Sequence, residues 1–130
     1  MSTARRVSAR WDGDLRAVVD AGRFQLIVDE PESVGGTDRG PQPTDVLLAS
    51  ITSCFAIAMA YAARKHGTEL SDLQVSASAT YDGPRFSTIA ISLTSTMPRA
   101  TLEQLIPLAK RVCYVTNTLR NPPEITISPT

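Results

Sequence analysis

The segment from Asp45 to Arg64 constrains the fold more than any other part of the chain. Its apolar residues recur at helical spacing, and they are Leu47, Ile51, Cys54, Ala58 and Tyr61. Thr44 or Asp45 can cap this helix, and Gly67 can end it just after His66. Other apolar residues flank that stripe on nearly every side, Leu48, Phe55, Ile57 and Met59 among them. A helix that is apolar nearly all round lies inside a structure, so in a chain of 130 residues we expect it at the centre of a dimer.

The same segment is the one stretch that could imitate a membrane span, from Val46 to Ala63. Ser50, Thr52 and Ser53 interrupt it, and its length is marginal for the ~20 residues that a span needs. We therefore expect a core helix and no membrane partner.

The charge balance and the cysteine count narrow the class of protein. Thirteen Lys and Arg residues balance thirteen Asp and Glu residues, and no basic block is visible, which argues against a nucleic-acid partner. Two cysteines are too few for a disulfide-stapled secreted domain, and no apolar segment follows the arginines near the start. A cytoplasmic protein is expected.

Two stretches of period-two alternation predict antiparallel strands. Residues 7–11, 15–20 and 24–28 form a three-stranded meander, and residues 73–81 and 89–93 form a hairpin around Asp82-Gly83-Pro84. Residues 31–43 contain turn formers only, so we expect a loop there.

A second helix is predicted over residues 101–119, beginning at the capping-box spacing Thr101-x-x-Gln104. Pro107 lies within it, so either this helix kinks or its regular part begins near Ile106. A short last strand is expected at residues 125–127. The result is an α+β fold, with helices packed on antiparallel sheets, in a single domain spanning residues 1–130.

One cysteine lies on each predicted helix, Cys54 on the first and Cys113 on the second. If these helices pack together, the two thiols can meet. With a single histidine in the chain, no zinc site is expected. Both cysteines can also be explained as small buried core residues.

Four segments resemble the OsmC/Ohr family of thiol peroxidases. Residues 43–54 match its pattern Pro-x-[Glu/Asp]-x-[Leu/Ile]-x-Ala-x-x-x-x-Cys, and residues 112–120 resemble its second-cysteine helix. Trp11-Asp12-Gly13 and residues 31–36 match two further landmarks in order. The resemblance implies antiparallel sheets around two central helices in an intertwined homodimer, with both sites at the subunit interface.

The resemblance also implies a chemistry, reduction of organic hydroperoxides in oxidative stress defence without a cofactor. Cys54 would be the peroxidatic thiolate that attacks the hydroperoxide, and Cys113 would be the resolving cysteine that forms a disulfide with it. An external dithiol, such as a lipoylated protein, would reduce that disulfide.

Two departures from the family pattern open an alternative. Where two branches of the family have an Arg before Asp-Gly and a Glu ten residues before the first cysteine, this chain has Trp11 and Thr44. The chain therefore resembles a less characterised third branch. A non-enzymatic dimer that binds a small apolar ligand is the alternative function.

Other residues could take over the missing roles. Three other arginines could supply the cation that stabilises the Cys54 thiolate, and they are Arg10, Arg16 and Arg39. Arg10 is the nearest of them in sequence to the family position. Residues that follow Cys113 at helical spacing could line the pocket, and they are Tyr114, Asn117 and Arg120. His66 is interpreted as a helix-end residue.

Overall fold

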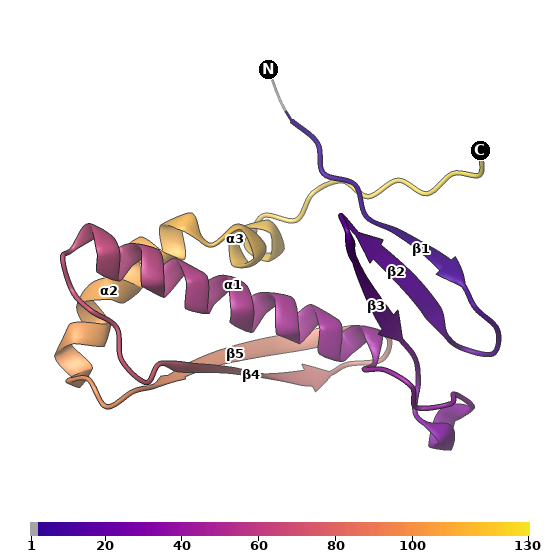
Figure 1. The fold of residues 1–130 in the computed structure, drawn as a ribbon, viewed down its shortest axis with the longest axis horizontal. Helices are drawn as coiled ribbons and strands as arrows, with labels where there is room; N and C mark the ends of the chain where they lie inside the picture. Colours follow the sequence, from indigo (N-terminus) through magenta and orange to yellow (C-terminus); the bar gives the residue numbers. More distant parts are fainter. Residues whose placement is uncertain (1–2) are drawn as a thin grey trace. The chain divides into compact units, whose positions relative to one another are not determined.

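The computed structural model describes residues 3–130, which form three strands, a long helix, a hairpin and two further helices in that order (Figure 1). The chain divides into two compact units, one up to Leu47 and the other from Leu48 onward. The single domain expected from the chain length stays a prediction.

The first unit contains the predicted meander. Strands β1 (Ser8–Trp11), β2 (Ala17–Ala21) and β3 (Phe24–Val28) pair antiparallel in that order. Their register is continuous, with Val19 opposite Ala9 on one side and opposite Leu26 on the other. The following loop contains a short 3-10 helix, Glu32–Val34, where the sequence predicted no regular element.

Asp29 holds this loop in place from a buried position, with only 1% of its surface exposed. Its carboxylate accepts hydrogen bonds from the hydroxyl of Thr37 at 2.5 Å and from three backbone N–H groups, those of Glu30, Thr37 and Arg39. These donors, the Thr37 hydroxyl above all, hold the pKa of Asp29 well below its usual range. The loop is therefore organised around one buried negative charge.

Arg16 joins the first hairpin to that loop. Its guanidinium donates to the hydroxyl oxygen of Thr37 at 2.8 Å and to the carboxylate of Asp12 at 3.0 Å. The hydrogen bond from Arg16 is the main reason that the pKa of Asp12 is lowered. Arg16 thus has a structural role within this unit.

Helix α1 (Pro43–Lys65) begins two residues before the predicted start, with proline at its first position, where no backbone donor is needed. Thr44 and Asp45 lie inside its first turn instead of capping it, because the carbonyl of Gln42 accepts the first helical hydrogen bond, from Val46.

The predicted end of α1 is confirmed. Gly67 has a φ of +65°, and the N–H of Thr68 donates to the carbonyl of Ala63. The ring of His66 donates to the carbonyl of Ala62 at 3.0 Å, so His66 is a helix-end residue.

The buried face of α1 overlaps the predicted stripe in part, since Ile51 and Ala58 are buried as expected. The buried residues are Ile51, Phe55, Ala58, Met59, Ala62 and Ala63. Leu47 and Tyr61, both placed on the predicted core stripe, are exposed. By length and composition α1 could also cross a membrane, with a mean hydropathy of 2.0, a property that it shares with core helices of soluble proteins.

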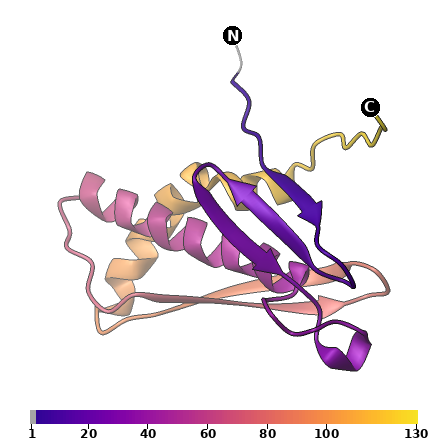
Figure 2. The same ribbon diagram turned by 45° about the vertical axis from the view of Figure 1, so that its right-hand side comes forward.

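In the second unit, α1 lies along the hairpin of β4 (Gln74–Tyr81) and β5 (Phe86–Thr94), with the last two helices beside it (Figures 1 and 2). The core contains side chains of α1 packed against Leu102, Leu105 and Ala109. Val75 and Ile91 of the hairpin cover this cluster. This arrangement confirms an α+β fold in which helices pack on an antiparallel hairpin.

The second predicted helix is wrong in its continuity and in its start. It is two helices, α2 (Arg99–Val112) and α3 (Tyr114–Arg120), which meet at Cys113 in an extended conformation. Helix α2 begins at Arg99, before the predicted capping box, and continues through Pro107.

The predicted last strand is also wrong. Residues 122–130 form no strand, since they pair with no strand of the described chain. Ile125 and Ile127 are 80% and 95% exposed there.

Candidate functional site

The break between α2 and α3 brings the two cysteines together. Cys113 takes φ −78° and ψ 103° at the break, and its sulfur lies 3.4 Å from that of Cys54 in the middle of α1. Both thiols are free. Cys113 is fully buried, whereas Cys54 is partly exposed. A disulfide bond is about 2.05 Å long, so a small approach of the sulfurs would close one.

The surroundings of the two thiols act differently on their pKa values. Burial raises the pKa of Cys54, and the neighbouring Cys113 raises it further, against the opposing effect of the N–H groups of Val115 and Tyr114. Burial also acts to raise the pKa of Cys113, but hydrogen bonds from the hydroxyl and N–H of Thr116 and from Cys54 outweigh it, and the pKa of Cys113 is lowered. When the pair loses one proton, the negative charge is therefore favoured on Cys113.

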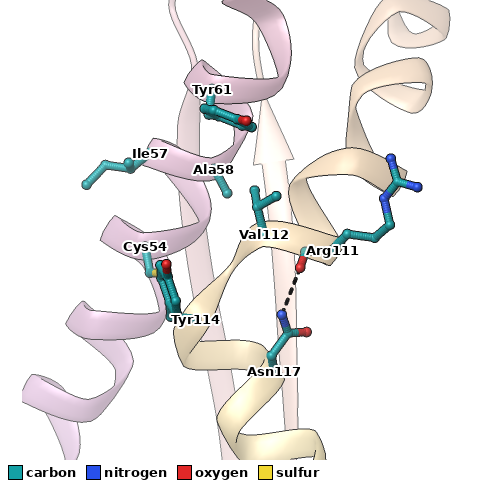
Figure 3. Close-up of a pocket in the computed structure, with 8 residues that line it drawn as sticks. All are labelled: Cys54, Ile57, Ala58, Tyr61, Arg111, Val112, Tyr114 and Asn117. Carbon is teal, nitrogen blue, oxygen red and sulfur yellow. Dashed lines mark hydrogen bonds between the residues drawn. The ribbon is translucent and has the colours of Figure 1, made fainter. Parts of the chain in front are cut away.

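Cys54 lines a cavity that Cys113 does not line, and we call it the thiol cavity. It has a volume of about 540 Å³ and is lined by Cys54, Ile57, Ala58, Tyr61, Arg111, Val112, Tyr114 and Asn117. The first four come from α1, and the others come from the end of α2 and from α3 (Figure 3). Because Cys113 lies behind this surface, a ligand in the thiol cavity meets the sulfur of Cys54 first.

Sequence reasoning found part of the cavity lining. Tyr114 and Asn117 line the thiol cavity as expected, while Arg120 lines a neighbouring one. Arg111 was missed, although it lies two residues before Cys113. Its side chain points away from Cys54 (Figure 3), so in this conformation it does not stabilise that thiolate.

Asn117 ties the two ends of the break together. Its side-chain amide donates to the backbone carbonyl of Arg111 at 3.0 Å (Figure 3). This hydrogen bond spans the turn that contains Cys113, so it helps to hold Cys113 behind Cys54.

Arg10, the predicted partner of the Cys54 thiolate, lies on β1 in the first unit. Its side chain is 67% exposed and forms an ion pair with Asp12 at 3.1 Å. The register between β1 and β2 is continuous through Arg10, so no bulge within that strand re-aims it. Since Cys54 belongs to the other unit, the pairing of Arg10 with Cys54 stays a prediction.

Within residues 3–130, no three side chains of His, Cys, Asp or Glu gather into a group that could hold a metal ion.

Comparison with known proteins gives one family and several similar structures. The model of the family described as OsmC-like protein matches residues 36–128. No curated protein matches the chain.

Three solved structures illustrate the likeness. A protein of Mycoplasma pneumoniae described as OsmC like is 17% identical, with a TM-score of 0.79 over 94% of this chain and 91% of its own. An osmotic stress induced and detoxification response protein of Psychrobacter arcticus is 21% identical, with a TM-score of 0.75 over 91% and 90%. An organic hydroperoxide resistance protein of Legionella pneumophila is 20% identical, with a TM-score of 0.68 over 91% and 90%. At these identities the three structures show a common fold.

Proposed function

The chain belongs to the family of OsmC-like proteins, and from that premise we propose that it is a thiol-dependent peroxidase that reduces organic hydroperoxides in oxidative stress defence. One observation carries this proposal. Two free thiols lie 3.4 Å apart, and one of them opens into an apolar cavity while the other is buried behind it. The fold-related protein of Legionella pneumophila is described as an organic hydroperoxide resistance protein, which supports the same activity.

The proposed reaction begins with the peroxidatic thiol Cys54. As its thiolate, Cys54 attacks the distal oxygen of the hydroperoxide, the O–O bond breaks, and the alkoxide leaves and takes up a proton as the alcohol. Cys54 is then a sulfenic acid. The thiolate of Cys113 attacks the Cys54 sulfur, the hydroxide that leaves becomes water, and a disulfide forms. An external dithiol, such as a lipoylated protein, reduces that disulfide by exchange.

When the pair has lost one proton, the remaining one is favoured on Cys54, so the attacking thiolate forms only after that proton moves. The hydrogen bonds from Thr116 favour the negative charge on Cys113, and Cys113 lies within reach of the Cys54 thiol. Transfer of a proton from Cys54 to Cys113 would generate the attacking thiolate without the arginine and glutamate that Trp11 and Thr44 replace. Because burial disfavours the charge on Cys54, we expect a slow enzyme.

The walls of the thiol cavity favour an alkyl hydroperoxide over hydrogen peroxide. Ile57, Ala58 and Val112 present carbon surface beside Cys54. Burial of an alkyl chain there stabilises the complex by about 25 cal/mol per Å² of apolar surface, a contribution that hydrogen peroxide cannot make.

The proposal includes a homodimer. Large apolar side chains beside the site are exposed in the single chain, with Ile57 70% and Tyr114 84% exposed. The meander is equally uncovered, since Trp11 is 75% and Phe24 62% exposed. Apolar surface of this extent is typical of a protein interface, and a second copy of the chain is the partner that we propose. We further propose a cytoplasmic location, where thiols stay reduced.

Rapid mixing with an organic hydroperoxide tests the proposed activity. Wild-type protein supplied with dihydrolipoamide should consume cumene hydroperoxide faster than it consumes hydrogen peroxide. The variant Cys54→Ser, which has one atom exchanged, is the matched control. If wild type is no faster than Cys54→Ser with either peroxide, the enzyme proposal fails in favour of the ligand-binding dimer.

A further inference from the structure

A second hollow adjoins the thiol cavity and is lined by positive charge. Its volume is about 660 Å³, and its lining contains three cations, Lys110, Arg111 and Arg120, together with Glu103, Asn117 and the apolar residues Ile106 and Pro107. We call it the basic hollow. Arg111 and Asn117 line both spaces, so the basic hollow and the thiol cavity share a wall.

The positive charge of the basic hollow is not cancelled by its one acidic residue. The carboxylate of Glu103 is already paired with Arg99 at 2.9 Å, one helical turn away. Among residues 3–130, none of the three cations that line the hollow forms an ion pair. The basic hollow therefore offers three positive charges to an anion from outside.

The helices hold these charges on one side of the unit. Glu103 and Lys110 lie seven residues apart on one face of α2, and Arg120 lies three residues after Asn117 on α3. The hydrogen bond from Asn117 to the carbonyl of Arg111 fixes one helix relative to the other. Cations in the last turn of a helix complement its dipole. That effect accounts for each cation singly, but not for their meeting in one hollow beside a reactive thiol.

We propose that the basic hollow binds the carboxylate of an amphipathic acid whose apolar chain lies in the thiol cavity. A guanidinium group donates two parallel hydrogen bonds to a carboxylate, and two arginines are present here. The side chain of Arg111 points away from Cys54 (Figure 3), which suits an anion at the far end of the ligand. Binding of the acid does not depend on peroxide chemistry. That the natural ligand carries a hydroperoxide group rests on the proposed function.

Calorimetric titration with decanoate and with 1-decanol tests this site, because the two probes share an alkyl chain and neither reacts with a thiol. We expect wild type to bind decanoate about tenfold more tightly than decanol, and this preference to shrink as salt is added. In the triple variant K110Q/R111Q/R120Q the preference should disappear. Arg85→Gln removes a cation from the β4–β5 turn, outside both hollows, and should keep it.

The outcomes separate this site from the proposed function. Equal affinities of wild type for decanoate and decanol would overturn the basic hollow as a carboxylate site. If Arg85→Gln lost the preference for decanoate as fully as the triple variant, the carboxylate site would also be overturned. Such a result would indicate that the overall charge of the protein attracts decanoate. If decanoate binds as expected and no peroxide is consumed, the basic hollow stands and the peroxidase proposal fails.

Discussion

Cys113 is the residue at which α2 ends and α3 begins, and from that break its sulfur lies 3.4 Å from the sulfur of Cys54. Only one of the two thiols lines the thiol cavity. The pair therefore has one sulfur at the thiol cavity and one in the core, and the proposed two-step oxidation uses them in that order.

Mild oxidation should link these two cysteines within one chain. One equivalent of an organic hydroperoxide is expected to give a Cys54–Cys113 disulfide, because the thiols are already nearly in bonding distance. Peptide mapping without reductant identifies the link. Disulfides that join two chains instead, or cysteines oxidised without any link, would contradict the two-cysteine cycle.

Replacing each cysteine in turn should separate the two steps. Cys54→Ser should abolish peroxide consumption, because the remaining thiol is buried behind the cavity. Cys113→Ser should allow a single turnover and leave a sulfenic acid on Cys54. Trapping with dimedone and mass spectrometry detects that acid. Repeated turnover by Cys113→Ser with dihydrolipoamide would show that the resolving role is wrong.

Thr116 offers a test of how the pair is ionised. The Thr116 hydroxyl donates to the backbone carbonyl of Cys113 at 3.4 Å and also lies within reach of the Cys113 thiolate, whose pKa it lowers. Thr116→Val keeps the shape but removes this hydroxyl, so the first ionisation of the pair should move to higher pH. The rate of alkylation by iodoacetamide, measured against pH, reports this midpoint. Thr118→Val is the matched control, because the Thr118 hydroxyl bonds the carbonyl of Tyr114 instead. An equal shift in both variants would contradict a specific role for Thr116.

The sequence predicted the elements of the fold better than the faces that they bury. The meander, the hairpin and the end of α1 were predictable because alternation and glycine act locally. The buried face of α1 was predictable only at Ile51 and Ala58, since apolar residues surround that helix and periodicity cannot choose among them. Packing against α2 selects Phe55 and Met59 over Leu47 and Tyr61.

The candidate site was predictable in its residue types and not in its geometry. The helical pattern around Cys113 continues on both sides, so no local signal marks the break that turns its thiol toward Cys54. Arg111 was missed for a similar reason. A cation in the last turn of a helix is explained by the dipole alone, and only the folded chain shows that it borders the thiol cavity.

The proposed dimer gives a prediction of mass and of its dependence on α1. Light scattering after gel filtration should report twice the 14.0 kDa of one chain at micromolar concentration. Ile57→Glu places a charge on the exposed apolar face of α1 and should weaken the dimer by tenfold or more, because an unpaired charge in an interface is costly. The control variant is Ser87→Glu, which places the same charge on an exposed residue of β5. A stable 14.0 kDa particle for wild type would contradict the dimer.

Because of Asp29, the free energy of unfolding should decrease at acid pH. Its folded-state pKa is depressed, so its contribution is fully present above the unfolded pKa of about 3.9 and is lost as pH falls below that value. Asp29→Asn keeps the size of the side chain but replaces one acceptor oxygen with a donor. Two donors would then lack an acceptor, either the hydroxyl of Thr37 and the N–H of Arg39, which share one oxygen, or the N–H groups of Glu30 and Thr37, which share the other. We expect the melting temperature at pH 7 to fall by several degrees.

The pH dependence distinguishes this charge from a merely structural contact. Thermal unfolding followed by circular dichroism should show a wide gap between wild type and Asp29→Asn at pH 7. That gap should narrow steadily below pH 4, because the carboxyl then takes up a proton in the unfolded chain while it stays ionised in the folded one, so acid favours unfolding of the wild type. Asp20→Asn is the matched control, since Asp20 is exposed and accepts a single hydrogen bond from Gln25, which an asparagine can also accept. A gap that stays constant from pH 7 to pH 3 would mean that Asp29 acts through its shape and not through its charge.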